Sequence, residues 1–187
     1  MRALTSLLVL LFLTSIQISC SSEKAVEEQT AAREPLKVYL VRHTEKVDQS
    51  RDPELSQAGK ERALELAKML RSTGIEYIHS SDYIRTRETA NPVAQTLGLT
   101  TEIYNPKELD SFAQKLRDKG GVHLVVGHSN STPSLVDLLG GKSGSKINDA
   151  GEYDRLYIIS DSGKGFVETT MIRYGDPYYE ESEEKGK

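Results

Sequence analysis

Apolar residues along this chain fall into two kinds of pattern, short continuous runs and helically spaced positions. Continuous runs occupy residues 38–41 and 124–126, and a histidine closely follows each of them, His43 and His128. A short apolar run without helical spacing, bounded by polar residues, is typical of a buried strand. Both strands are therefore predicted to end at titratable side chains.

Between these runs, apolar positions recur at the three- and four-residue spacing of amphipathic helices. Ser56 is suited to cap the first helix, which is expected to end at Gly74. Pro92 interrupts the second helical pattern, so a kink, or a restart capped by Asn91, is expected there. Helices are thus predicted near residues 57–73, 85–97, 109–119 and 132–139, and further strands near residues 75–81, 100–104, 155–160 and 166–174.

The alternation of strands and helices predicts a three-layer α/β/α sandwich with a mainly parallel sheet. The two final strands flank a glycine-containing turn at residues 161–165, which indicates an antiparallel edge. We expect one domain over residues 36–176 and a charged, disordered tail over residues 177–187. A net charge of −4, from 24 basic and 28 acidic residues, argues against nucleic acid as a partner.

The first twenty residues have the layout of a secretory signal. Arg2 is followed by a mostly apolar run through residue 18, so residues 1–19 are predicted to be a signal peptide. The Ser-Cys-Ser-Ser sequence around Cys20 resembles a bacterial lipobox, which implies that Cys20 is lipidated and becomes the first mature residue. Residues 20–35 lack apolar periodicity and are expected to form a flexible tether. The resemblance implies a membrane-anchored bacterial lipoprotein outside the cytoplasm.

Gln17 and Ile18 depart from the lipobox pattern, which prefers leucine and a small residue there. Two alternatives therefore stay open, an uncleaved anchor helix and cleavage near Ser19 that leaves a free thiol. The apolar run is marginal for a spanning helix, which needs roughly 20 apolar residues. Because Cys20 is the only cysteine, no disulfide can form within one chain.

Four polar side chains are predicted to meet at one edge of the sheet. Arg42 and His43 follow the first strand, Arg85 opens the helix after the second strand, and His128 follows the fourth strand. The carboxyl ends of parallel strands share one edge, where open α/β sheets bind ligands. Guanidinium groups suit phosphate oxygens, and they should keep a neighbouring imidazole neutral and nucleophilic. We expect a phosphate site with His43 as nucleophile; the plainer alternative is a strand that ends at a solvated Arg-His pair.

Three short segments resemble the signatures of the histidine phosphatase superfamily, the phosphoglycerate-mutase-like proteins. They are VRHTE at residues 41–45, SSDYIRT at residues 80–86 and VGHS at residues 126–129, and LSQAG at residues 55–59 is also similar. The resemblance runs from about Lys37 to Tyr174, and it departs at Thr44, where many relatives carry glycine. It implies phosphoryl transfer through a phosphohistidine intermediate and a phosphoglycerate-mutase-like fold. It also implies that His43 is the nucleophile, that Arg42, Arg85 and His128 bind phosphate, and that neither metal nor cofactor takes part.

The family also uses an acid that protonates the leaving oxygen. Glu108 is the first candidate and Asp110 the second, because both follow the third predicted strand. Either carboxylate would equally suit the first turn of a helix, where the macrodipole favours negative charge. Glu45 either hydrogen-bonds the pocket or caps its loop, and His79 is expected to be structural.

The leading hypothesis is a phosphatase that hydrolyses a small phosphomonoester or a related phospho-compound. A mutase is disfavoured because a secreted enzyme lacks the glycolytic pool, and a protein phosphohistidine phosphatase fits the size but not the compartment. One alternative class is a non-catalytic module that captures phosphorylated ligands on the same fold. Another is a metallohydrolase using His43 and His128, which the adjacent arginine makes unattractive.

Overall fold

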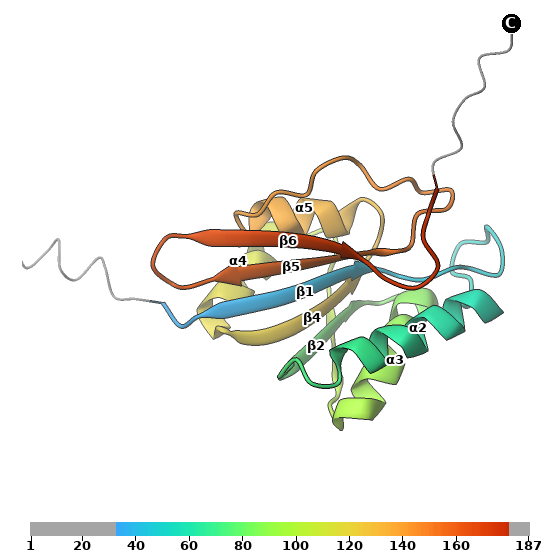
Figure 1. The fold of residues 1–187 in the computed structure, drawn as a ribbon, viewed down its shortest axis with the longest axis horizontal. Coiled ribbons are helices and arrows are strands. Elements are labelled where there is room, and N and C mark those ends of the chain that lie inside the picture. Colours follow the sequence, from blue (N-terminus) through green and yellow to red (C-terminus); the bar gives the residue numbers. More distant parts are fainter. Residues whose placement is uncertain (1–32, 180–187) are drawn as a thin grey trace, which may run out of the picture. The chain divides into compact units, whose positions relative to one another are not determined.

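A six-stranded sheet runs through the part of the chain that the computed structural model describes, residues 33–179 (Figure 1). Its strand order is β3-β2-β4-β1-β5-β6. The four strands β3, β2, β4 and β1 are mutually parallel, whereas β5 and β6 run antiparallel at one edge. The predicted mainly parallel sheet with an antiparallel edge is therefore confirmed. The strands are β1 (Leu36–Arg42), β2 (Tyr77–Ser81), β3 (Thr101–Tyr104), β4 (Gly121–Gly127), β5 (Arg155–Asp161) and β6 (Val167–Arg173).

Two pairs of helices cover the two faces of the sheet and complete the predicted three layers (Figure 1). On one face, α2 and α3 bury apolar side chains such as Leu66 and Val93 against Val41 of β1. On the other face, α4 and α5 bury Phe112 and Leu135 in a second cluster with the sheet. Each face thus has its own apolar core. The helices are α2 (Gln57–Leu70), α3 (Ile84–Leu97), α4 (Leu109–Lys119) and α5 (Ser131–Leu138).

The helix termini show where local sequence decides the structure and where it does not. Ser56 caps α2 as predicted, because its hydroxyl oxygen accepts a hydrogen bond from the Gly59 amide at 3.1 Å. Helix α3 continues through Pro92, so the predicted restart at Asn91 is wrong. Ala90, Val93 and Ala94 on both sides of the proline are buried against the sheet. This packing offsets the one backbone hydrogen bond that the proline removes.

The strand ends bring the candidate residues to one edge of the sheet. Because β1, β2 and β4 are parallel, their carboxyl ends lie together, as the positions of Arg42 and Gly127 in paired register show. Strand β5 is antiparallel to β1, so the residues before Arg155 reach that same edge. Within residues 33–179, no helix is long and apolar enough to cross a membrane.

Several predictions fall on residues outside the described range. These are the signal peptide (residues 1–19), the lipidated Cys20, most of the tether (residues 20–35) and the end of the charged tail, residues 180–187. They stay predictions.

Candidate active site

His43 lies buried directly after β1, with its ring oriented by the backbone. Its side chain is 3% exposed, and its own amide donates to the carbonyl of Gly127 at 2.9 Å. Nδ1 lies 2.8 Å from the carbonyl oxygen of Thr44, which can only accept, so Nδ1 carries the proton. Nε2 is then the ring nitrogen with the free lone pair. It has no hydrogen-bond partner among residues 33–179.

Burial is the main reason that His43 is neutral. The pKa of His43 is lowered to about 3, mainly by burial and in smaller part by the charges of Arg42, His128 and Arg85. The carbonyl of Thr44 opposes this shift only in part. The prediction of a neutral imidazole agrees with this environment, although desolvation outweighs the arginines as its cause. At neutral pH, His43 therefore presents an unprotonated nitrogen to the site.

His128 follows β4 and faces His43, with ring centroids 5.5 Å apart. Its Nε2 lies 2.8 Å from the Ser81 hydroxyl, and its Nδ1 lies 3.4 Å from Nη2 of Arg85. Because the guanidinium can only donate, Nδ1 is the acceptor and Nε2 carries the proton. Burial and the two arginines lower the pKa of His128 to about 4, so this ring is also neutral.

Arg42 is almost fully committed to the loop of residues 148–152. Nη1 donates to the carbonyl oxygens of Asn148 and Glu152, both at 3.0 Å. Nη2 donates to the backbone carbonyl and to Oδ1 of Asp149, both at 2.8 Å. These four bonds use all four terminal N–H groups, and Nε is buried without a partner among the described residues. Arg42 therefore has only its Nε–H left for a ligand and cannot bind phosphate bidentately through its two terminal nitrogens.

Arg85, in the first turn of α3, keeps most of its donors available. Nη1 lies 3.3 Å from Oδ1 of Asp52, Nη2 bonds the His128 ring, and its Nε is buried and unpaired within the described chain. Three of its five N–H groups thus have no acceptor among residues 33–179. Asp52 also accepts a hydrogen bond from the Ile84 amide at 2.9 Å, so one carboxylate caps α3 and orients Arg85.

The structure brings together the four residues predicted to act on phosphate, Arg42, His43, Arg85 and His128. Among residues 33–179, the buried Nε atoms of both arginines have no hydrogen-bond partner, and they belong to a cluster with two neutral imidazoles. Buried donors without acceptors are costly, so an oxyanion is the natural complement of this cluster.

Sequence reasoning missed two residues of the cluster, Asp149 and Tyr153. The Tyr153 ring lies 4.1 Å from the Arg42 guanidinium and 5.9 Å from the His43 ring. Asp149 accepts from the Ser129 hydroxyl at 2.6 Å as well as from Arg42. Both precede an antiparallel strand, whose amino end shares the edge with the carboxyl ends of the parallel strands. The polar run before Arg155 was the signal that could have found them.

The structure does not bring Glu108 into this cluster. The Glu108 side chain is exposed and accepts a hydrogen bond from the side-chain amide of Asn105 at 2.8 Å. It lines a separate cavity of about 600 Å³ between β3 and α4. Asp110 is exposed in the first turn of α4. Among the described residues, no hydrogen bond or ion pair joins either carboxylate to His43. Both have the geometry of an ordinary helix start, which was the alternative to the acid role.

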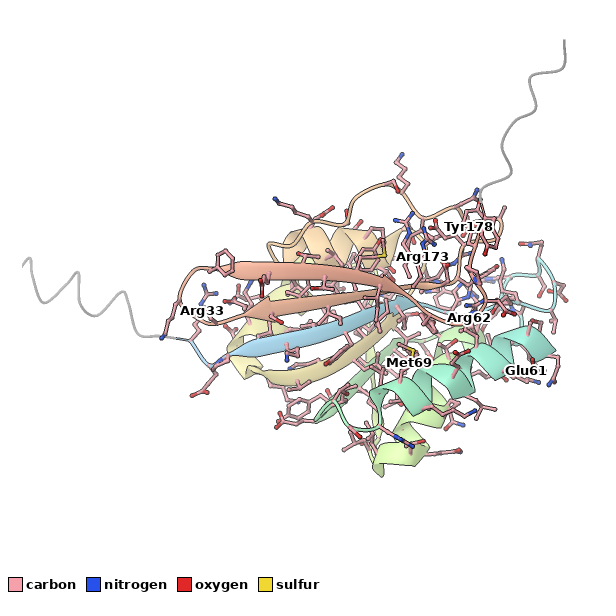
Figure 2. All side chains as sticks on the ribbon, viewed as in Figure 1. Arg33, Glu61, Arg62, Met69, Arg173 and Tyr178 are labelled. Carbon is pink, nitrogen blue, oxygen red and sulfur yellow. The ribbon has the colours of Figure 1, made fainter. Side chains whose placement is uncertain are left out.

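Glu45 and His79 are structural. Both carboxylate oxygens of Glu45 accept from Nε of Arg62, at 2.9 and 3.1 Å, and Arg62 extends from α2 to the chain after β6 (Figure 2). Glu45 therefore anchors its loop to α2. His79 is buried, with Nε2 3.0 Å from Nδ1 of His123. In residues 33–179 no three His, Cys, Asp or Glu side chains are arranged as a set that could hold a metal ion.

Residues 38–113 match the family model described as "Histidine phosphatase superfamily (branch 1)". Among curated proteins, the chain is similar to a protein described as "Probable phosphoglycerate mutase GpmB" from Salmonella paratyphi A. The two are 30% identical over 132 residues, which cover 61% of this chain and 59% of that protein. The chain thus spans less than two thirds of the length of this relative.

Two solved structures share the fold. The protein histidine phosphatase SixA complexed with tungstate superposes with a TM-score of 0.60 at 18% identity, covering 74% of this chain and 97% of that chain. A phosphoglycerate mutase from Bacillus anthracis str. Sterne superposes with a TM-score of 0.60 at 16% identity, covering 79% of this chain and 96% of that chain. The described domain therefore has the α/β fold of phosphoglycerate-mutase-like proteins.

Proposed function

We propose that this chain, whose residues 38–113 belong to the histidine phosphatase superfamily, hydrolyses a small phosphomonoester or related phospho-compound through a phosphohistidine on His43. Phosphatase-type activity agrees with the family and with the phosphatases and mutases that it resembles. The single observation that carries the proposal is the state of His43. Its Nδ1–H donates to the Thr44 carbonyl, and neither its Nε2 nor the Nε atoms of the neighbouring arginines have a hydrogen-bond partner among residues 33–179.

In the first step, Nε2 of His43 attacks phosphorus and the bond to the leaving oxygen breaks. The ring of the intermediate is then positively charged, and its Nδ1–H continues to donate to the Thr44 carbonyl. Water subsequently attacks the same phosphorus, which releases inorganic phosphate and restores the neutral imidazole. No metal ion takes part in this proposal.

Arg85 supplies most of the available hydrogen-bond donors in these steps. Its three unoccupied N–H groups can meet the oxygens of the transferring phosphoryl group, and Nε of Arg42 adds one more donor. Donors that are already positioned stabilise the charge of the transition state without reorganising, which is the main source of catalysis in phosphoryl transfer. His128 gains the anion as a neighbour when phosphate binds, which favours its protonated, hydrogen-bond-donating form.

Hydrolysis of para-nitrophenyl phosphate in the presence of a chelator tests the proposal, with His43→Ala compared with the wild type. We expect turnover by the wild type and a loss of at least a thousandfold in the variant. The matched control is His79→Gln, which alters another buried histidine outside the site and should retain turnover. Activity that survives in His43→Ala would overturn the nucleophile. Wild-type turnover that requires an added metal would favour a metallohydrolase, and oxyanion binding without turnover would favour a binding module.

We also propose that the domain is held outside the cytoplasm by a lipid on Cys20, and that it acts there on a small phosphorylated substrate. The support is the positive residue, apolar run and lipobox-like sequence of the first twenty residues. The mass of the mature amino terminus tests this. A lipidated Cys20 as the first residue is the expected result, and an unmodified Cys20 would contradict it.

A further inference from the structure

A phosphatase that cleaves unactivated phosphate esters must protonate the leaving oxygen, and the carboxylates near His43 are poorly suited to this. Asp149 accepts hydrogen bonds from Ser129 and Arg42, and the Ser129 bond is the largest cause that lowers its pKa. Both oxygens of Glu45 are paired with Arg62. Asp52 accepts from the Ile84 amide and from Arg85. Each of these three carboxylates accepts every hydrogen bond that it makes among the described residues, so none of them has a proton directed at a ligand.

His128 is no better placed to donate, because both of its ring nitrogens already have hydrogen-bond partners. Its one ring proton, on Nε2, is directed to the Ser81 hydroxyl, and Ser81 passes the hydrogen bond on to Thr86 at 3.1 Å. Its other nitrogen, Nδ1, accepts from Arg85. A second proton on His128 would have to sit on Nδ1, the nitrogen that faces the Arg85 guanidinium.

Two tyrosines next to the cluster carry O–H groups. The ring of Tyr83 lies against His128 and Arg85, whereas Tyr153 is the one whose ring lies beside the nucleophile His43. The side chain is 8% exposed, and its ring stacks on the Arg42 guanidinium and lies beside the His43 ring. Its hydroxyl has no hydrogen-bond partner in the described chain and is open to solvent, unlike the sealed hydroxyl of Tyr174. A buried ring next to the nucleophile, with an accessible hydroxyl that has no partner among residues 33–179, is suited to meet a substrate.

We propose that the Tyr153 hydroxyl is the proton donor to the leaving oxygen, in the place that the sequence had suggested for Glu108. This inference rests on the proposed phosphatase function. As Nε2 of His43 forms its bond to phosphorus, the bond from phosphorus to the leaving oxygen breaks, and that oxygen takes the Tyr153 proton. The products are a neutral alcohol, phosphohistidine and tyrosinate. When water attacks the phosphohistidine, the tyrosinate takes a proton from that water, so Tyr153 and His43 return to their starting forms.

The surroundings of Tyr153 support both halves of this cycle. Burial raises the pKa of the Tyr153 hydroxyl, so it remains protonated at neutral pH and is available as a donor. The Arg42 guanidinium over the ring opposes that shift and stabilises the tyrosinate that forms after transfer. Arg85 lowers this pKa in the same way, whereas Asp149 and Glu45 raise it.

The test is the dependence of Tyr153→Phe on the leaving group, because this variant keeps the ring over Arg42 and removes only the hydroxyl. General acid catalysis is worth roughly a hundredfold or more for a poor leaving group. We expect kcat/KM for an alkyl phosphate such as glycerol phosphate to fall about a hundredfold. The loss for para-nitrophenyl phosphate, whose leaving group needs little protonation, should be at least tenfold smaller. Vanadate affinity reports whether the phosphate site itself is intact, and we expect it to change less than about threefold.

Tyr178→Phe is the matched control, since the Tyr178 hydroxyl accepts from the Asn148 side chain at 2.8 Å in the same loop region. Its effects on the two substrates should be equal. Equal losses for both substrates in Tyr153→Phe, or no loss, would overturn the proton-donor role. The His43→Ala variant separates the two proposals: if it keeps activity on both substrates, the proposed function fails, whereas a dead His43→Ala with equal losses in Tyr153→Phe refutes Tyr153 alone.

Discussion

Two arginines that the sequence presents as equal phosphate ligands should respond very differently to replacement by lysine. Arg42 makes four hydrogen bonds to residues 148–152, and its side chain is 1% exposed. A lysine ammonium donates from one point and cannot reach acceptors at both ends of a planar fork. Hydrogen bonds to charged groups contribute about 1.5–3 kcal/mol each. If Arg42→Lys loses two of the four bonds, the free energy of unfolding should fall by about 3 kcal/mol or more.

Arg85→Lys should leave stability almost unchanged and weaken ligand binding. The pair with Asp52, whose side chain is 37% exposed, spans 3.3 Å, and such pairs contribute about 0–1 kcal/mol. Arg85 has three N–H groups available for an oxyanion, and lysine cannot offer the same coplanar arrangement. Losing one charged hydrogen bond of about 1.5–3 kcal/mol corresponds to vanadate affinity about tenfold to a hundredfold weaker.

Urea unfolding followed by circular dichroism measures the stability of both variants, because the chain has no tryptophan to serve as a fluorescent probe. Vanadate titration measures ligand affinity under the same conditions. A free energy of unfolding for Arg42→Lys within about 1 kcal/mol of the wild type would refute the structural role of Arg42, and so would an Arg85→Lys variant that is destabilised as much as Arg42→Lys.

Three further outcomes follow from the same contacts. Glu108→Gln should change kcat/KM for a phosphomonoester by less than about twofold, and a loss above tenfold would support Glu108 as the proton donor. Because the pKa values of His43 and His128 are lowered to about 3 and about 4, the unfolded chain binds more protons than the folded chain below about pH 6.5. The free energy of unfolding should therefore fall as the pH drops from 7 to 5, by up to about 1.4 kcal/mol per pH unit for each of the two histidines. Urea unfolding of His43→Asn should show a smaller decrease over the same pH range. Asp52→Ala removes the acceptor for the first turn of α3 and should lower the free energy of unfolding by about 1 kcal/mol in the same assay, whereas an unchanged value would show that this cap contributes nothing.

The sequence placed the strand ends correctly because the determinants are local. An apolar run followed at once by Arg42 and His43, and another followed by His128, mark where buried strands stop. Parallel pairing of β1 with β4 then sets Arg42 beside Gly127. The positions of Arg42, His43 and His128 therefore follow from the hydrophobic pattern and the strand directions alone.

The roles of the two arginines could not be read in the same way. How many N–H groups remain free depends on acceptors that arrive from distant segments: residues 148–152 for Arg42 and Asp52 for Arg85. The same limitation hid Tyr153, which reaches the site because β5 runs antiparallel to β1. No local pattern encodes these long-range contacts.

Glu108 shows the opposite error, in which sequence position was taken as spatial position. It follows a strand of the sheet, but that strand, β3, lies at the far edge and is separated from β1 by β2 and β4. The side chain then bonds to Asn105 and lines the cavity against α4. Pro92 is a similar case, since tertiary packing of α3 overrides a local helix-breaking signal.

In the proposed mechanism, His43 becomes phosphorylated during turnover. The most direct measurement is rapid quenching of the enzyme with excess para-nitrophenyl phosphate under alkaline conditions, followed by mass spectrometry of the peptides. A phosphohistidine is expected on the peptide that contains His43, formed as fast as the nitrophenol burst and absent from His43→Asn. Turnover by the wild type without any phosphoryl group on His43 would rule out the phosphohistidine intermediate. The same phosphorylated peptide from His43→Asn would rule it out as well.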